Sequence, residues 1–152
     1  MVNLMMKNSK INKHIQEWID IVENETYKVS NDQKQLVKHI KWCFENEEIY
    51  TDDEQLEKYI SLIKYFPYET LMPWQKFVIG LHDCTYWKET GMPRWPDLFC
   101  LIGRGAGKDG TIAWESVCLA SPYNYKIREY DVDICANNEE QAMRPVYDII
   151  NA

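Results

Sequence analysis

The amino-acid sequence predicts an α/β protein, with a helical leader over residues 1–70 and the first β-α-β-α elements of a parallel sheet over residues 71–152. Two observations predict this fold class. Apolar residues recur every three or four positions through the leader, which is the period of an amphipathic helix. Beyond it, two runs with strand character flank a helical stretch that is long enough for a parallel crossover. A chain of 152 residues is too short for two complete enzyme domains.

The leader is predicted to contain three helices. The first covers about residues 10–24. The second begins at a capping box formed by Ser30 and Gln33, and the third at a capping box formed by Thr51 and Glu54. The apolar positions of the first helix are Ile11, Ile15, Trp18, Ile19 and Val22.

The second part of the chain begins with a short helix and then takes on strand character. Pro73 suits the first turn of that helix. Residues 98–102 form a continuous apolar run, which predicts a strand buried on both faces. A helix over about residues 108–119 follows, then an alternating strand over residues 130–136 and a last helix capped by Asn138. The predicted buried side of the short helix consists of Trp74, Phe77, Val78 and Leu81.

The net charge of −7 and the pI of about 5.0 argue against a protein whose whole surface binds nucleic acid. They leave room for a local basic site. Every arginine lies in the second part of the chain, so phosphate contacts are expected there, because the guanidinium group suits bidentate phosphate binding. Three of these arginines match no motif and are interpreted as surface charges. They are Arg94, Arg128 and Arg144.

The cysteines predict reduced thiols in a cytoplasm, because there are five of them, no pair has C-x-x-C spacing, and the first residues are polar. No apolar run approaches the roughly 18 residues that span a bilayer, so no membrane association is expected. His82 and Cys84 form an H-x-C pair that is conceivable as part of a zinc site. Buried structural thiols are the favoured interpretation, because the four-ligand spacing of zinc sites is missing.

The motif that carries chemistry lies between residues 101 and 110, where a predicted strand is followed by Gly103-Arg104-Gly105-Ala106-Gly107-Lys108 and a helix start. Glycines let successive backbone N–H groups face an anion, and the helix N-terminus adds partial positive charge. A lysine at this place can reach the β- and γ-phosphates of a nucleotide. Ile102 and Asp109 depart from the pattern G-x-x-x-x-G-K-[ST], so an ordinary glycine-rich turn remains the alternative interpretation.

Four segments together resemble the large subunit of tailed-phage terminases, the ATPase that packages DNA in phages and prophages. Residues 103–108 resemble its variant Walker A loop, and residues 71–77 (LMPWQKF) are similar to its adenine motif. Residues 133–142 resemble the strand and helix that follow the Walker A helix, and the leader ending at residues 60–67 is similar to the leader of these proteins. The resemblance spans nearly the whole chain and implies the start of a P-loop NTPase domain over residues 71–152, with an incomplete parallel sheet.

The resemblance implies that this chain binds ATP and Mg²⁺. Gln75 matches the glutamine that reads the adenine edge, and Arg104 matches a loop arginine that senses the γ-phosphate. Trp74 is expected either to stack near the base or to belong to the core of its own helix. The phosphate cradle matches Gly105, Ala106, Gly107 and Lys108.

Asp109 occupies the position where a phosphate loop usually carries Ser or Thr. A carboxylate is a harder Mg²⁺ ligand than a hydroxyl, but it also repels a polyphosphate unless the metal lies between them. We therefore hypothesise that Asp109 ligates Mg²⁺ and makes nucleotide affinity unusually dependent on that ion. The competing interpretation is a degenerate loop that binds nucleotide poorly.

No catalytic residue is assigned, because an acidic strand end for Mg²⁺ and a glutamate that orients the attacking water are both missing. Asp131 and Asp133 are interpreted as the solvent-facing side of the second strand. The nuclease domain of terminases is missing as well, so the sequence is expected to be an N-terminal fragment that does not turn over ATP alone. The resemblance implies double-stranded DNA, the small terminase subunit and the portal as partners, in the cytoplasm of a bacterial host.

Two other functions remain open. The first is a fragment of another P-loop or helicase-like ATPase with a glutamine adenine motif. The second is a small non-enzymatic α/β protein that binds a phosphate ligand or a partner protein.

Overall fold

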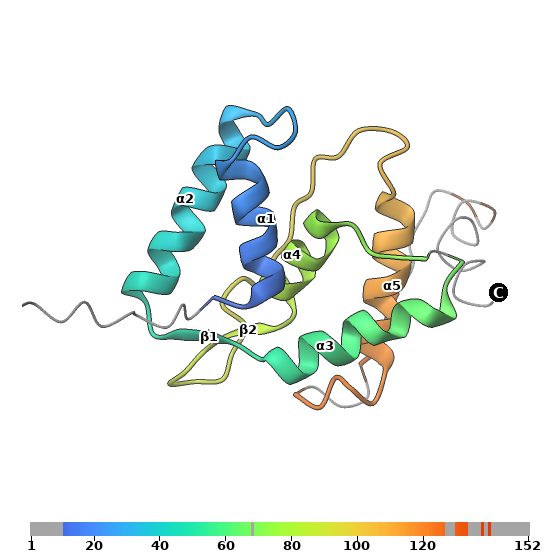
Figure 1. Cartoon of the computed structure of the whole chain (residues 1–152). Helices are drawn as coiled ribbons and strands as arrows, with labels where there is room; N and C mark the ends of the chain where they lie inside the picture. Colours follow the sequence, from blue (N-terminus) through green and yellow to red (C-terminus); the bar gives the residue numbers. More distant parts are fainter. Residues whose placement is uncertain (1–10, 68, 127–129, 134–137, 139, 141–152) are drawn as a thin grey trace, which may run out of the picture.

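The structure, a computed structural model, describes residues 11–67, 69–126, 130–133, 138 and 140 (Figure 1). Within these residues the chain forms a mixture of helices and one small antiparallel sheet. No helix among them has the length and apolar character needed to cross a membrane. The elements are α1 (Lys13–Glu23), α2 (Asn31–Asn46), β1 (Ile49–Thr51), α3 (Asp53–Ser61), the 3₁₀ helix η1 (Leu62–Tyr65), α4 (Pro73–His82), β2 (Thr85–Trp87) and α5 (Lys108–Ala120).

The first two predicted helices are confirmed as α1 and α2. The capping box of α2 is confirmed as well, because the Gln33 N–H donates to Ser30 Oγ at 3.2 Å and the Ser30 N–H donates to Gln33 Oε1 at 2.8 Å. These signals are local in sequence, so a pattern of a few residues suffices to predict them.

The predicted start of the third helix is wrong by one residue. Asp52, and not Thr51, caps α3, and its carboxylate accepts a hydrogen bond of 3.0 Å from the Gln55 N–H. The Thr51 side chain is engaged elsewhere, since its hydroxyl lies 3.0 Å from that of Thr85 across the sheet. A tertiary contact therefore decides which of two adjacent capping residues is used.

The sheet differs from the expected one in place and direction. β1 pairs with β2 in antiparallel register, with Tyr50 opposite Tyr86 (Figure 1). The leader is therefore not entirely helical, because it contains β1. This strand pairs with β2 from the second part of the chain. The described residues contain no parallel sheet, so the predicted parallel P-loop sheet is not supported.

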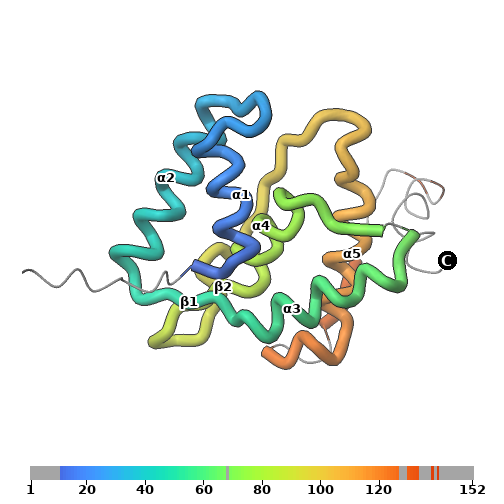
Figure 2. Tube along the Cα trace, viewed as in Figure 1, coloured from blue at the N-terminus to red at the C-terminus, as the bar shows by residue number. Residues whose placement is uncertain are grey.

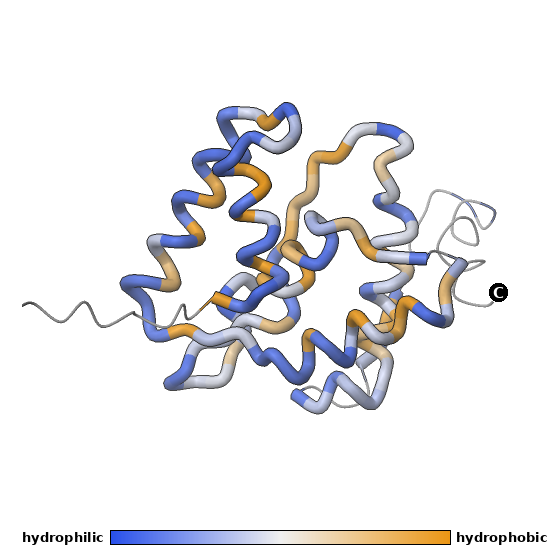
Figure 3. Tube along the Cα trace, in the orientation of Figure 1, coloured by the Kyte–Doolittle hydropathy of each residue, from blue (hydrophilic) through white to orange (hydrophobic). Residues whose placement is uncertain are grey.

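The predicted buried strand over residues 98–102 is wrong for this structure. The run has no ladder partner among the described residues, and Phe99 and Leu101 are 91% and 92% exposed. Figure 3 shows it as a hydrophobic stretch of the segment that leads into α5. An apolar run becomes a buried strand only where neighbouring strands satisfy its backbone. Residues 130–133 also form no strand, and the rest of the second strand and most of the last helix lie outside the described residues.

The core consists of two apolar clusters, and α4 contributes to both. In the view of Figure 2, α4 lies between α1 and α5. Phe77 and Leu81 belong to a cluster built with α1, α2 and β1, whereas Ile79 belongs to a cluster built with α3, η1 and α5. A helix that buries residues on opposite sides has to be apolar around most of its circumference. The predicted buried side of α4 differs from the observed one in two ways. It omits Ile79, which is buried completely, and it includes Trp74 and Val78, which are only partly buried.

Pro73 stands in the first turn of α4, as predicted. Gly80 marks the closest approach of its neighbours, because a Cβ there would lie 3.1 Å from a side-chain carbon of Ile15 and 3.1 Å from one of Leu56. Helices α1 and α3 can approach α4 at this point only because the position lacks a side chain. Elements from both sides of residue 70 thus pack together, and the division into two domains stays a prediction.

Candidate functional site

The loop before α5 and the first turn of α4 line a common cleft of about 450 Å³. Trp74 and Gln75 line it from α4, and Gly105, Ala106 and Gly107 line it from the loop. These are two of the segments that carry the sequence resemblance, and they lie about thirty residues apart in the chain. The fold therefore brings five of the predicted site residues to one place.

Gln75 is buried, and hydrogen bonds hold both ends of its amide group. Its Oε1 accepts from the backbone N–H of Met72 at 2.7 Å, which completes the turn at the start of α4. Its Nε2 donates to Thr111 Oγ1 at 2.8 Å. The Thr111 hydroxyl in turn donates to the carbonyl oxygen of Gly107 at 2.9 Å. Three consecutive hydrogen bonds thus connect the start of α4 to the end of the glycine loop.

These hydrogen bonds use half of the hydrogen-bonding capacity of the Gln75 amide. A side-chain amide has two N–H donors and two acceptor lone pairs, and each contact uses one of them. One donor and one acceptor remain, and the two contacts fix the orientation of the amide group. Thr111 is a site residue that the sequence patterns missed. Thr111 lies one turn into α5, and side chains in a helix point back toward the N-terminus. A polar residue at this position is therefore the signal that could have predicted it.

The glycine loop has a backbone conformation that suits an anion. Gly105 and Gly107 have φ angles of +81° and +84°, a region that residues with a side chain rarely adopt. Gly107 is the N-cap of α5, and no side chain caps this end of the helix. The first N–H groups of a helix have no partner within it, and they carry the positive end of the helix dipole. The loop therefore presents uncapped donors next to the cleft.

The three charged residues of the predicted site lie apart from the lining of this cleft. Lys108 Nζ lies 2.6 Å from Asp109 Oδ1, and both side chains are largely exposed. Arg104 is exposed as well. Lys108 lines a second hollow of about 400 Å³, which it shares with Trp74 and Thr111. In this conformation the ammonium group is paired with the neighbouring carboxylate, so a phosphate would have to replace that pair.

Trp74 lines both hollows and is partly buried. One part of the indole is therefore held by neighbouring side chains, while another part borders open space. A flat aromatic surface in such a place is suited to stacking on a planar ligand. The geometry is compatible with both expected roles of Trp74, stacking on a ligand and packing in the core of its helix.

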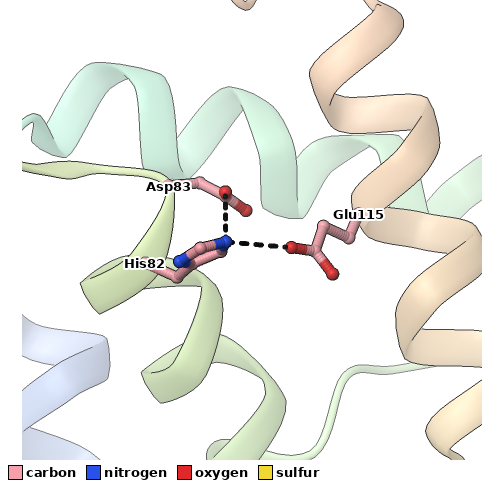
Figure 4. A group of neighbouring side chains, drawn as sticks. All are labelled: His82, Asp83 and Glu115. Atoms are coloured by element: carbon pink, nitrogen blue, oxygen red, sulfur yellow. Dashed lines mark ion pairs between the residues drawn. The ribbon is translucent and has the colours of Figure 1, made fainter. Parts of the chain in front are cut away.

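A separate group of titratable side chains lies at the other end of α4. It consists of His82, Asp83 and Glu115 (Figure 4). Burial raises the pKa of the Asp83 carboxyl well above its usual value, and the charge of Glu115 raises it further. Burial also raises the pKa of Glu115, which the charge of His82 partly offsets. The H-x-C pair pointed to His82, but Cys84 belongs to the second apolar cluster and not to this group.

Comparisons of this chain with models of protein families, with curated proteins and with solved structures found no match.

Proposed function

We propose that the cleft between α4 and the start of α5 binds the nucleotide ATP, with the phosphates on the glycine loop and the base beside Gln75. One observation carries this proposal. The segment that resembles an adenine motif and the segment that resembles a Walker A loop line the same cleft, although they lie far apart in sequence.

The chemistry of the lining supports a nucleotide over a simpler ligand. Uncapped N–H groups at the N-terminus of α5 and the left-handed glycines Gly105 and Gly107 suit a phosphate group. The remaining donor and acceptor of Gln75 suit the edge of adenine, which also offers one of each. A volume of about 450 Å³ falls within the range of ordinary small-molecule pockets.

Lys108 and Asp109 complete the site only after their mutual ion pair opens. A polyphosphate would attract the Lys108 ammonium group away from Asp109 Oδ1, which now lies 2.6 Å from it. Asp109 would then be an unpaired carboxylate beside an anionic ligand. Bound Mg²⁺ would supply the positive charge that removes this repulsion. We therefore expect that Mg²⁺ strengthens nucleotide binding more here than in a loop with Ser at this position.

The wider role that we propose follows from the terminase resemblance. Nucleotide binding would then serve a motor that moves double-stranded DNA into a procapsid, together with a small terminase subunit and a portal. We assign no residue to hydrolysis. The same cleft would also suit another P-loop or helicase-like ATPase, or a small protein that binds a phosphate ligand.

The first test is a calorimetric titration of the full chain with ATP, with and without Mg²⁺. Lys108→Met should weaken ATP binding by about 10- to 100-fold, the expected cost of losing a charge-assisted hydrogen bond. Lys88→Met is the matched control, because Lys88 also forms an exposed ion pair, at 2.9 Å from Glu48. Equal effects of the two substitutions, or no binding of ATP to the wild type, would refute the proposal.

The second test separates a nucleotide site from a simple phosphate site. The same titration is repeated with inorganic phosphate, and Gln75→Ala is compared with Thr111→Val, which removes the same hydrogen bond from the other side. A nucleotide site predicts weaker ATP binding in Gln75→Ala than in Thr111→Val. Phosphate that binds as tightly as ATP, with no difference between the two variants, favours the non-enzymatic phosphate-binding protein.

A further inference from the structure

His82, Asp83 and Glu115 converge from two places in the chain. His82 is the last residue of α4, Asp83 follows it as the C-cap, and Glu115 lies in the middle of α5 (Figure 4). The potential ligand atoms of the three side chains all lie within 4.8 Å of one another. Their side chains are 18%, 5% and 17% exposed, so the group is largely withdrawn from solvent.

One hydrogen bond orients the imidazole ring of His82. Its Nδ1 lies 2.7 Å from the carbonyl oxygen of Trp95, a group that can only accept, so Nδ1 carries a proton. In a neutral ring the lone pair of Nε2 then faces the two carboxylates, as Figure 4 shows. A metal-binding histidine commonly donates its second ring N–H to a backbone carbonyl in this manner. The tautomer is therefore the one that a metal requires.

The spacings around His82 Nε2 suit a bound ion better than direct hydrogen bonds. Nε2 lies 3.8 Å from Asp83 Oδ1 and 3.6 Å from Glu115 Oε1, both beyond hydrogen-bond length. Nitrogen and oxygen ligands lie about 2.0–2.2 Å from Zn²⁺, which puts two ligands of a tetrahedral ion about 3.3–3.6 Å apart. The two separations from His82 Nε2 match this arrangement after shifts of a few tenths of an ångström.

Asp83 supplies an independent observation. Its side chain is only 5% exposed, and its Oδ2 atom is buried without a hydrogen-bond partner among the described residues. In Figure 4 this carboxylate faces the space between His82 and Glu115. Leaving a buried polar atom unsatisfied costs about 1–3 kcal/mol, and more when the group is charged. A cation among the three side chains would remove this cost if it contacts Asp83 Oδ2.

We propose that His82 Nε2, Asp83 and Glu115 bind a divalent transition-metal ion, such as Zn²⁺, that ties the end of α4 to α5. An imidazole with carboxylates suits such ions, whereas Mg²⁺ prefers oxygen ligands alone and retains its waters. The site does not depend on the nucleotide proposal, because none of its ligands lines the cleft of Gln75. It also differs from the H-x-C pair of the sequence, because Asp83 and not Cys84 is the second ligand.

The test measures the thermal unfolding of the full chain with added Zn²⁺, and the visible absorption of added Co²⁺, both without nucleotide. Cys100 is replaced by serine throughout, because its thiol is exposed and borders the same hollow as His82 and Glu115. Cys135, which lies outside the described residues, is replaced by serine as well. We expect Zn²⁺ to raise the Tm and Mg²⁺ to leave it unchanged. Co²⁺ should show the intense visible bands of a tetrahedral site.

Asp83→Asn and Glu115→Gln keep the shape of the side chains and remove their charges. Each should weaken Zn²⁺ binding by about 10- to 100-fold or more, since even residues beyond the direct ligands have effects of this size. His39→Gln is the control, because His39 is an exposed histidine that lies outside this group. If Glu115→Gln does not fold, Asp83→Asn alone decides the question.

Two results would overturn the site. One is an unchanged Tm of the parent chain at Zn²⁺ concentrations that saturate ordinary protein sites. The other is a Zn²⁺ effect of equal size in the parent chain and in Asp83→Asn.

Discussion

Gln75 on α4 donates a hydrogen bond of 2.8 Å to Thr111 Oγ1 on α5, and both residues are buried. This contact joins the two helices that line the candidate nucleotide cleft. It also holds the amide group of Gln75 in a fixed orientation at the edge of the glycine loop.

The Gln75–Thr111 contact should be measurable as a coupling between two substitutions. Gln75→Ala and Thr111→Val should each lower the free energy of unfolding by about 1–2 kcal/mol, because each leaves a buried polar partner unsatisfied. The double variant should lose about 1 kcal/mol less than the sum of the single losses. Urea denaturation of the four proteins provides the measurement, and strictly additive losses would contradict a direct contact.

Gly80 should not tolerate a branched side chain. A Cβ there would already lie 3.1 Å from carbons of Ile15 and Leu56, and both neighbours are completely buried. Gly80→Val should therefore cost about 1–3 kcal/mol through overpacking, despite the low helix propensity of glycine. Gly103→Val is a contrast within the same chain, because nothing lies within 4 Å of a Cβ at that position. A Gly80→Val protein with unchanged urea midpoint would contradict the packing described.

Arg94 is a structural residue, so its interpretation as a plain surface charge is wrong. Its Nε and Nη2 atoms donate to the two carboxylate oxygens of Glu47 at 2.6 and 2.9 Å, and its guanidinium group lies 4.8 and 5.0 Å from the ring centres of Trp87 and Trp95. The hydrogen bond from Arg94 lowers the pKa of Glu47. Stability from this pair is therefore fully present above the pKa of glutamate in the unfolded chain, about 4.3. It is lost as the pH falls through the lower pKa of the folded state.

Arg94→Met should destabilise the protein by about 1.5–3 kcal/mol at pH 7, the usual size for hydrogen bonds to charged groups. The difference from wild type should begin to shrink as the pH falls below about 4.3, where Glu47 becomes protonated in the unfolded chain. It should shrink further as the pH falls through the lower pKa of Glu47 in the folded wild type. Lys88→Met is the control, because an exposed pair contributes only about 0–1 kcal/mol. Denaturant melts between pH 3 and pH 7 check this, and a difference that stays constant with pH would assign the effect to ring stacking alone.

Cys100 should be the fast-reacting thiol among the described cysteines. Cys43, Cys84 and Cys118 are completely buried, whereas Cys100 is exposed. Partial burial and the charge of Glu115 still raise the Cys100 pKa, so its reaction should be slower than that of a free thiol. In a Cys135→Ser chain, a chromogenic disulfide reagent should modify one thiol before unfolding and three after it. A fast phase that survives in Cys100→Ser would show that a buried thiol is accessible.

The elements that the sequence predicts correctly depend on short stretches of chain. The helical periods of α1 and α2, the Ser30 capping box, the place of Pro73 and the start of α5 at Lys108 all follow from interactions between residues a few positions apart. The resemblance assigned Gln75 and the glycine loop to one nucleotide site, and this assignment stays a prediction. The structure shows that both line the same cleft.

The elements that were predicted wrongly depend on partners elsewhere in the chain. Thr51 lost its capping role because Thr85 lies across the sheet from it. The apolar run of residues 98–102 has strand composition, but a strand forms only where another backbone pairs with it. Composition alone therefore could not decide whether this run is buried.

By itself, the sequence determined which segments are helical, because helix formation depends on local backbone preference. It also predicted which loop could hold a phosphate group. Only the tertiary structure decided that β1 pairs with β2, that Thr111 orients Gln75, and that Glu115 reaches His82 and Asp83. Each of these contacts joins residues separated by thirty or more positions. These residues come together because α4 packs against both apolar clusters. The spacing of apolar residues along the chain does not predict which side chains will then be in contact.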